Sequence, residues 1–119
     1  MNYENVIELL LGEFPNLKES LEADDYLSDL PHCIFEMIVI PYVKKMCETA
    51  EKGGLINLGK FLEKMAICED KKVNELLNVS FLEPIVLADE EVIPFLQSYL
   101  GKRTIEELDY WQKRYGQHK

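Results

Sequence analysis

The side chains best suited to chemistry are two histidines and three glutamates in apolar surroundings. His32 opens an apolar stretch, and His118 lies next to the last residue of the chain. Two histidines are few for acid–base catalysis, and none follows Glu36, Glu63 or Glu83 at the three-residue spacing of a di-iron bundle. We expect no catalytic residue. We expect these three glutamates to be structural, because each lies at the edge of the apolar face of its helix. A carboxylate in that position can accept a hydrogen bond from the N-terminus of a neighbouring helix or pair with a lysine.

The three cysteines give no metal-binding pattern. Cys33, Cys47 and Cys68 are odd in number, lie in or next to apolar stretches, and form no C-x-x-C. His32 adjoins Cys33, but a tetrahedral zinc site needs about four ligands at recognisable spacing. We therefore expect buried, reduced thiols, no metal and no cofactor. The sequence also contains no Walker loop, nucleophile elbow, dinucleotide fingerprint or H-E-x-x-H, so no enzymatic activity is predicted.

The chain is strongly acidic, with a net charge of −9. Residues 1–30 hold eight acidic residues and a single basic one, Lys18. Such a field repels phosphate groups, so we expect no direct contact with nucleic acid or an anionic membrane. It attracts a basic protein instead. The alternative is a solvated acidic surface that only keeps the protein soluble.

Length and hydropathy indicate a single-domain protein without a membrane span. A chain of 119 residues is long enough for one core and one domain. No apolar run reaches the roughly 18 residues of a membrane span, and the acidic N-terminus is unlike a signal peptide. We therefore expect a cytoplasmic protein.

Apolar residues recur at helical spacing along the whole chain, whereas strand signals are weak. The sequence predicts an all-α fold, a compact antiparallel bundle of about six or seven helices. We divide its single domain, 1–119, into acidic N-terminal helices over 1–30, a helical core over 31–115 and a tail over 116–119.

Several residues predict where helices begin. Asp29 is expected to cap the helix that Pro31 opens, and Asp70 and Asp89 are expected to cap two later helices. Thr104 is predicted to open the last helix through a capping box with Glu107, which lies three residues further on.

Glycine and proline residues predict where helices end or are distorted. Gly53 and Gly54 form the clearest turn signal in the chain. Pro41 lies inside the most apolar helix, so we expect a kink near Met37 and Ile38, or a break.

The tripeptide Phe-Leu-Glu occurs twice, at 61–63 and at 81–83. Both copies lie in helical apolar patterns about twenty residues apart, the spacing of one helix and one turn in stacked helical hairpins. We expect the Phe-Leu pairs to pack two neighbouring helices, and the second half of the chain to be HEAT-like.

Aromatic residues are expected both in the core and on the surface. Trp111 is predicted to anchor the last helix, but it cannot face inward together with both Tyr110 and Tyr115. Tyr26 adjoins acidic residues, which is a plausible contact for lysine or arginine side chains.

A series of motifs carries a family resemblance over about residues 30 to 115. In order, they are LPHCIFEMIVIPYV, LGKFLEKM, VSFLEPI and YLGKRTIEELDYW. This series resembles small helical bacterial immunity proteins found beside polymorphic or contact-dependent growth-inhibition toxins. The resemblance implies a protein that binds the C-terminal domain of a cognate toxin in the cytosol and blocks it. The sequence does not give the oligomeric state, and a monomer when free is the default expectation.

Many such toxins are nucleases with basic substrate-binding faces, so carboxylates of this chain are expected to mimic phosphates. The expected partner-binding residues are acidic side chains and one tyrosine near helix junctions: Glu22, Asp24, Asp25, Tyr26, Asp29, Glu69, Asp70, Asp89, Glu90 and Glu91. The alternative is a HEAT-like regulatory or scaffold module with another protein partner. An enzyme with an acidic pocket is a third reading.

Overall fold

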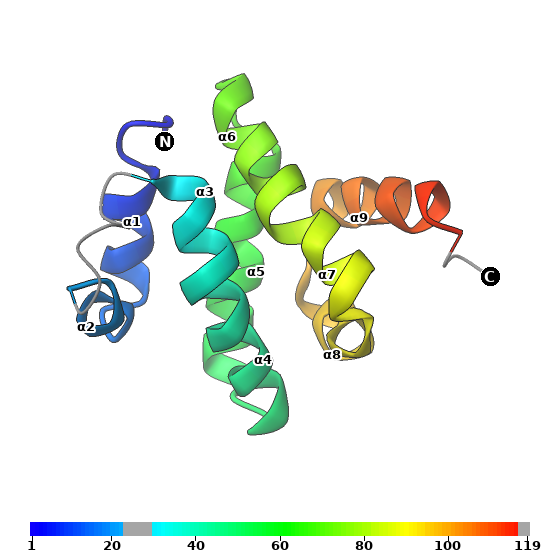
Figure 1. Cartoon of the computed structure of the whole chain (residues 1–119), viewed down its shortest axis with the longest axis horizontal. Coiled ribbons are helices and arrows are strands. Elements are labelled where there is room, and N and C mark those ends of the chain that lie inside the picture. The colour runs from blue at the N-terminus through cyan, green and yellow to red at the C-terminus, as the bar shows by residue number, and fades with distance from the viewer. Residues whose placement is uncertain (23–29, 117–119) are drawn as a thin grey trace.

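The computed structural model describes residues 1–22 and 30–116. Within these ranges the chain forms seven continuous helical segments and no strand, which confirms the predicted all-α bundle (Figure 1). The segments are α1 (Val6–Glu13), α2 (Leu17–Glu22), α3–η2–α4 (Pro31–Ile34, Phe35–Val39 and Ile40–Glu48), α5 (Lys52–Ala66), α6–η3–α7 (Lys71–Leu77, Asn78–Leu82 and Glu83–Ala88), η4–α8–η5 (Glu90–Val92, Ile93–Leu96 and Gln97–Tyr99) and α9 (Lys102–Arg114).

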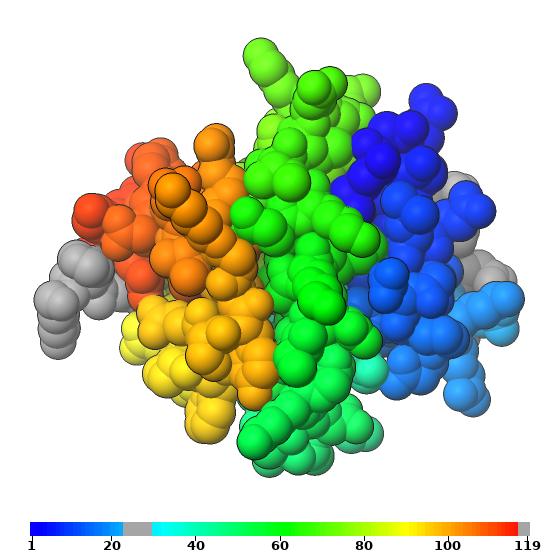
Figure 2. Space-filling view, turned by 180° about the vertical axis from the view of Figure 1, so that it is seen from behind, coloured from blue at the N-terminus to red at the C-terminus, as the bar shows by residue number. Residues whose placement is uncertain are grey.

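The helices are arranged in two layers. In Figure 1 the segment α3–α4 and the segment α6–α7 run side by side in the same direction, with α5 behind them in the opposite direction. From behind, α5 crosses the middle of the molecule between α1–α2 on one side and α8–α9 on the other (Figure 2). α9 packs against both α5 and α7. The second half thus resembles two stacked helical hairpins, although α9 crosses α5 instead of lying along it.

Both front helices contain a π-helical turn directly before a proline. In η2 the N–H of Ile40 donates to the carbonyl of Phe35, and Pro41 follows. In η3 the N–H of Glu83 donates to the carbonyl of Asn78, and Pro84 follows. Because proline has no N–H, the series of main-chain hydrogen bonds along the helix lacks one donor, and the turn before the proline widens into a π turn. Near Met37 and Ile38, where a kink or a break is expected, the structure has a π turn, and the helix continues through Pro41 without a break.

The core is built from the apolar stripes that the sequence predicts. Leu62 and Phe81 are completely buried, and Phe61 and Leu82 are nearly so, which confirms that the two Phe-Leu pairs pack neighbouring helices. None of the three cysteines forms a disulfide; Cys47 is buried as expected, whereas Cys33 and Cys68 are only half-buried. No described helix is both long and apolar enough to cross a membrane.

The expected turn at Gly53 and Gly54 is wrong, because both residues lie in the first turn of α5. The chain reverses at Ala50 instead, which has a positive φ of 54°. Gly54 is needed for space: a Cβ there would lie 2.6 Å from the sulfur of Met46. Gly54 therefore lets α5 approach the Met46 side chain of α4 closely, whereas Gly53 has open space around it.

The predicted caps have mixed outcomes. Asp70 caps α6 as predicted, since its side chain accepts a hydrogen bond from the N–H of Lys72. Asp89 stands at the predicted position, but its side chain makes no capping bond. The predicted capping box at Thr104 is wrong, because α9 begins at Lys102 and Thr104 lies inside its first turn. Asp29 lies outside the described residues.

Candidate partner-binding groove

A groove runs between the two front helices, from their π turns, η2 and η3, toward their C-terminal ends. It consists of two adjoining hollows of about 510 and 560 Å³, which share Glu36, Ile40 and Asp89. We call it the α4–α7 groove. It is lined by Glu36, Ile40, Pro41, Lys44, Lys45, Glu48, Val79, Glu83, Pro84, Leu87, Ala88 and Asp89.

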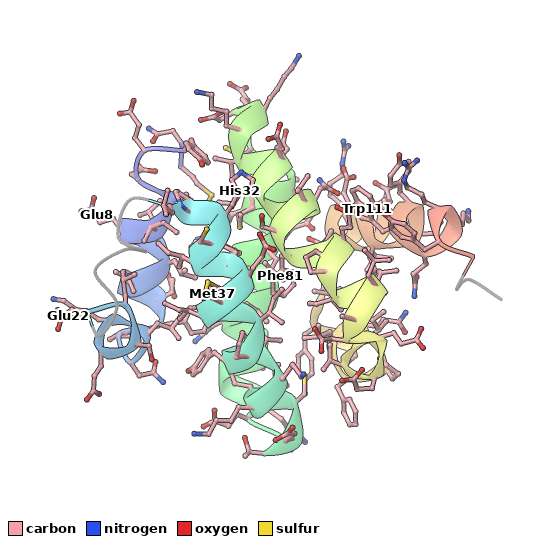
Figure 3. All side chains as sticks on the ribbon, in the orientation of Figure 1. Glu8, Glu22, His32, Met37, Phe81 and Trp111 are labelled. Atoms are coloured by element: carbon pink, nitrogen blue, oxygen red, sulfur yellow. The ribbon has the colours of Figure 1, made fainter. Side chains whose placement is uncertain are left out.

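The two π turns shape the groove. η2 and η3 contact each other, and the prolines that follow them, Pro41 and Pro84, line its two walls. Each proline leaves one main-chain carbonyl of the preceding turn without its helical donor. Figure 3 shows His32 and Phe81 where the two helices approach each other. π turns within α-helices recur at functional sites, because they redirect side chains locally.

Two groove carboxylates are held by neutral hydroxyl groups. The Ser80 hydroxyl donates to Oε2 of Glu36, with 3.3 Å between the oxygens. The Tyr115 hydroxyl donates to Oε2 of Glu83, and this bond raises the pKa of Tyr115. The hydroxyl of Tyr115 therefore stays protonated at neutral pH. Both bonds orient a carboxylate without neutralising its charge.

A third carboxylate of the groove has a basic partner. Nζ of Lys44 lies 2.8 Å from Oδ1 of Asp89, so the pair bridges α4 and the end of α7. This contact raises the pKa of Lys44, first through the hydrogen bond and then through the charge of Asp89. The interaction explains why Asp89 does not cap the following helix. Being exposed, the pair adds little to stability.

Exposed apolar side chains accompany these charges. Val79 and Leu87 line the groove with 43% and 54% of their surface exposed. Met37, at 61%, lies on the same helix as Glu36 and lines a second hollow against α2. Apolar side chains next to polar groups are typical of protein-binding surfaces.

A chain of polar contacts below the groove has the residue types of a catalytic triad. Nδ1 of His32 lies 2.5 Å from the Ser80 hydroxyl oxygen, which also bonds Glu36. Ser80, however, has no exposed surface, so no substrate reaches its hydroxyl. Ser80 also lies between His32 and Glu36, whereas in a catalytic triad the histidine lies between the nucleophile and the carboxylate. The arrangement links η2 to η3 and provides no nucleophile.

The buried thiol of Cys47 gives no reactive centre either. Burial raises the pKa of the Cys47 thiol, with a smaller contribution from Glu48, which keeps it protonated and unreactive. Among residues 1–22 and 30–116, no group of three or more histidine, cysteine, aspartate or glutamate side chains is placed to hold a metal ion.

Those of the predicted partner-binding residues that the structure describes do not form one surface. Glu69 and Asp70 precede α6, whereas Asp89, Glu90 and Glu91 follow α7. The whole of α6–α7, roughly 27 Å of helix, separates the two groups. Glu22 ends α2, and of the set only Asp89 lines the α4–α7 groove. The other expected residues lie outside the described ranges: Asp24, Asp25, Tyr26 and Asp29.

Sequence reasoning missed the groove itself. It treats Glu36 and Glu83 as structural carboxylates, and both do accept hydrogen bonds inside the fold. The available signal is the pair of prolines, Pro41 and Pro84, each within a strongly apolar helical stretch. Together they mark two helices with the same interruption.

Residues 7–117 match a protein family described as a domain of unknown function, DUF7674. Because the match spans nearly the whole chain, the chain belongs to this family. No curated protein and no solved structure matches it.

Proposed function

We propose that this member of the DUF7674 family is an immunity protein, which binds and neutralises a cognate toxin domain through the α4–α7 groove. The observation that carries the proposal is the combination of exposed Val79 and Leu87 with Glu36 and Glu83, which form no ion pair with a base of the described residues. Apolar contacts supply affinity at such a surface, and the charges select the partner.

The overall charge supports a basic partner. With a net charge of −9, the chain attracts a positively charged domain and accelerates the encounter. A nuclease-type toxin has such a surface where it binds nucleic acid, and carboxylates replace phosphates there. Inhibition then results from covering the active site of the toxin, in the cytoplasm and without chemistry by this chain.

The acids at helix junctions receive a different role in this proposal. Glu22, Glu69 and Glu90 are exposed but distributed over separate parts of the molecule. They contribute long-range attraction, which depends on salt, and they make no direct contact in the groove. The direct contacts belong to the groove residues.

A HEAT-like regulatory or scaffold module is the second candidate. The segments α3–α4 and α6–α7 lie parallel in one layer of the molecule (Figure 1). This arrangement favours a scaffold module, because stacked helical repeats bind partners on surfaces formed by parallel helices. The same groove would then bind a partner other than a toxin. A gene for a large secreted toxin directly upstream favours immunity over this alternative.

The decisive experiment is co-expression with the C-terminal domain of the toxin encoded beside this gene. We expect cells that make both proteins to grow, and cells that make the toxin domain alone to die. If cells with both proteins die equally fast while this chain is folded and abundant, the immunity function is wrong.

A further inference from the structure

We infer that the α4–α7 groove binds an arginine side chain of its partner between Glu36 and Glu83. The inference deepens the proposed function, since it rests on the groove being the partner-binding face. It names the chemistry of the contact, which the proposed function leaves open.

The larger hollow of the groove has the right charge for a guanidinium group. Glu36 of η2 and Glu83, the first residue of α7, line its two sides, and Asp89 lies at its end. No lysine or arginine of the described chain lines this hollow. Lys44 and Lys45 line the adjoining hollow, and Lys44 already pairs with Asp89. Neither Glu36 nor Glu83 forms an ion pair with a described base, although Arg114 bonds the Tyr115 hydroxyl that donates to Glu83. Both carboxylates are therefore open to pairing with an external cation.

The carboxylates are positioned before any partner arrives. Ser80 is completely buried and Tyr115 is half-buried, so neither hydroxyl that holds a carboxylate can turn freely into solvent. Hydrogen bonds from neutral donors restrict the carboxylates and preserve their charge. A partner therefore loses less side-chain entropy in binding them than it would on flexible surface glutamates.

The apolar part of the hollow fits the rest of an arginine side chain. Ile40, Val79, Pro84 and Leu87 surround the carboxylates. The methylene stem of arginine packs against such side chains, while the planar guanidinium donates to two carboxylates at once. The ammonium of lysine is a more strongly hydrated point charge and bridges two carboxylates less well.

Other occupants fit the hollow less well. The three carboxylates that line it are not placed to hold a metal ion together. A second copy of this chain would bring another nine negative charges toward the first. A partner segment with arginine between apolar residues meets both the charge and the apolar surface.

The test is an amide NMR titration of the whole chain with a capped peptide, alanine-leucine-arginine-leucine-alanine. We expect saturable shift changes at the amides of Ile40, Val79 and Leu87, with a Kd in the millimolar range. The same peptide with citrulline, which is nearly isosteric and neutral, should bind at least tenfold more weakly. The arginine peptide should likewise bind at least tenfold more weakly to the Glu36→Gln variant and to the Glu83→Gln variant than to the wild-type protein.

The matched control is Glu8→Gln. Glu8 lies on α1 at the edge of the molecule, away from the groove (Figure 3), so its loss should leave the Kd unchanged. No saturable shift change up to about 5 mM peptide overturns the inference, as does equal binding of arginine and citrulline. Shift changes that need calcium ions, or that come with dimerisation, overturn it in favour of a cation or a second copy.

This outcome is separable from that of the proposed function. If the peptide binds as expected but the toxin domain is not neutralised, the groove binds arginine and the immunity function is wrong. If the toxin domain is neutralised but citrulline binds as well as arginine, immunity stands and the arginine contact is wrong.

Discussion

The carboxylate of Glu63 holds the first turn of α9 through Thr104, although 41 residues separate them in the chain. Oε1 of Glu63 accepts the main-chain N–H of Thr104 at 2.9 Å and its hydroxyl at 2.8 Å, and Oε2 accepts the N–H of Arg103 at 3.2 Å. Gly101 makes room, because a Cβ there would lie 2.5 Å from this carboxylate. A side chain of α5 thus caps the helix that the sequence predicts to cap itself.

Replacing Glu63 by glutamine should destabilise the fold in a pH-dependent way. Burial alone raises the pKa of the Glu63 carboxyl, but the hydrogen bonds from Thr104 and Arg103, with the charge of Arg103, outweigh it and lower the pKa. Because the pKa of Glu63 is lower in the folded chain than in the unfolded chain, ionised Glu63 stabilises the folded state at pH values above the pKa of the unfolded chain. This stabilisation is lost as the pH falls through the pKa that Glu63 has in the folded chain.

We therefore expect Glu63→Gln to lower the free energy of unfolding by about 1–2 kcal/mol at pH 7. The difference from wild type should disappear in acid. Urea unfolding at a series of pH values measures it, with Glu8→Gln as the control. A difference that is independent of pH would show that the charge of Glu63 does not stabilise the first turn of α9.

Two glycines of α5 should respond oppositely to alanine. A Cβ at Gly59 would lie 1.9 Å from the carbonyl oxygen of Tyr99, whereas one at Gly53 meets no atom within 4 Å. We expect Gly59→Ala to cost about 1–3 kcal/mol of stability through overpacking. Gly53→Ala should be neutral or add up to about 1 kcal/mol, because alanine favours helix. Thermal unfolding of both variants tests this, and equal melting temperatures would contradict the close approach at Tyr99.

Removing the side chain of Asn78 should loosen the last helix. Nε1 of Trp111 donates to Oδ1 of Asn78 at 2.9 Å, and the Trp111 ring stacks on Tyr115. Asn78→Ala leaves the indole N–H without this partner, so we expect a loss of about 1–2 kcal/mol.

Trp111 is the only tryptophan of the chain, and its fluorescence reports this change directly. The emission of Asn78→Ala should shift to longer wavelength as the ring becomes more exposed. Asn16→Ala, which removes a contact with the Tyr42 hydroxyl at the surface, is the control and should leave the spectrum unchanged. An unshifted Asn78→Ala spectrum would contradict the role of this hydrogen bond.

Much of the fold follows from the sequence alone, because it depends on local patterns. Apolar periodicity predicts the helices and the packing of Phe61 and Phe81, and the missing N–H of Pro41 predicts the disturbed turn. The edge-of-stripe position of Glu63 correctly predicts a carboxylate at a neighbouring helix N-terminus.

The remaining features depend on contacts between distant residues. Asp89 has the right type and place for a cap, but Lys44 competes for its carboxylate. Gly53 and Gly54 carry a turn signal, yet Gly54 is required by the proximity of Met46. The α4–α7 groove forms between two helices that are distant in the sequence, which no local pattern of a single helix predicts.

The most direct test of the groove as the partner-binding face is the affinity of the toxin domain encoded beside this gene for Glu36→Lys. Glu36 is exposed, but the reversal also removes the acceptor of the Ser80 hydroxyl, so equal melting temperatures of variant and wild type are the control for an intact fold. We expect the Kd to rise at least tenfold, that is by about 1.4 kcal/mol or more, whereas Glu8→Lys should change it less than threefold. A Glu36→Lys variant that binds the toxin domain as tightly as wild type would contradict the account.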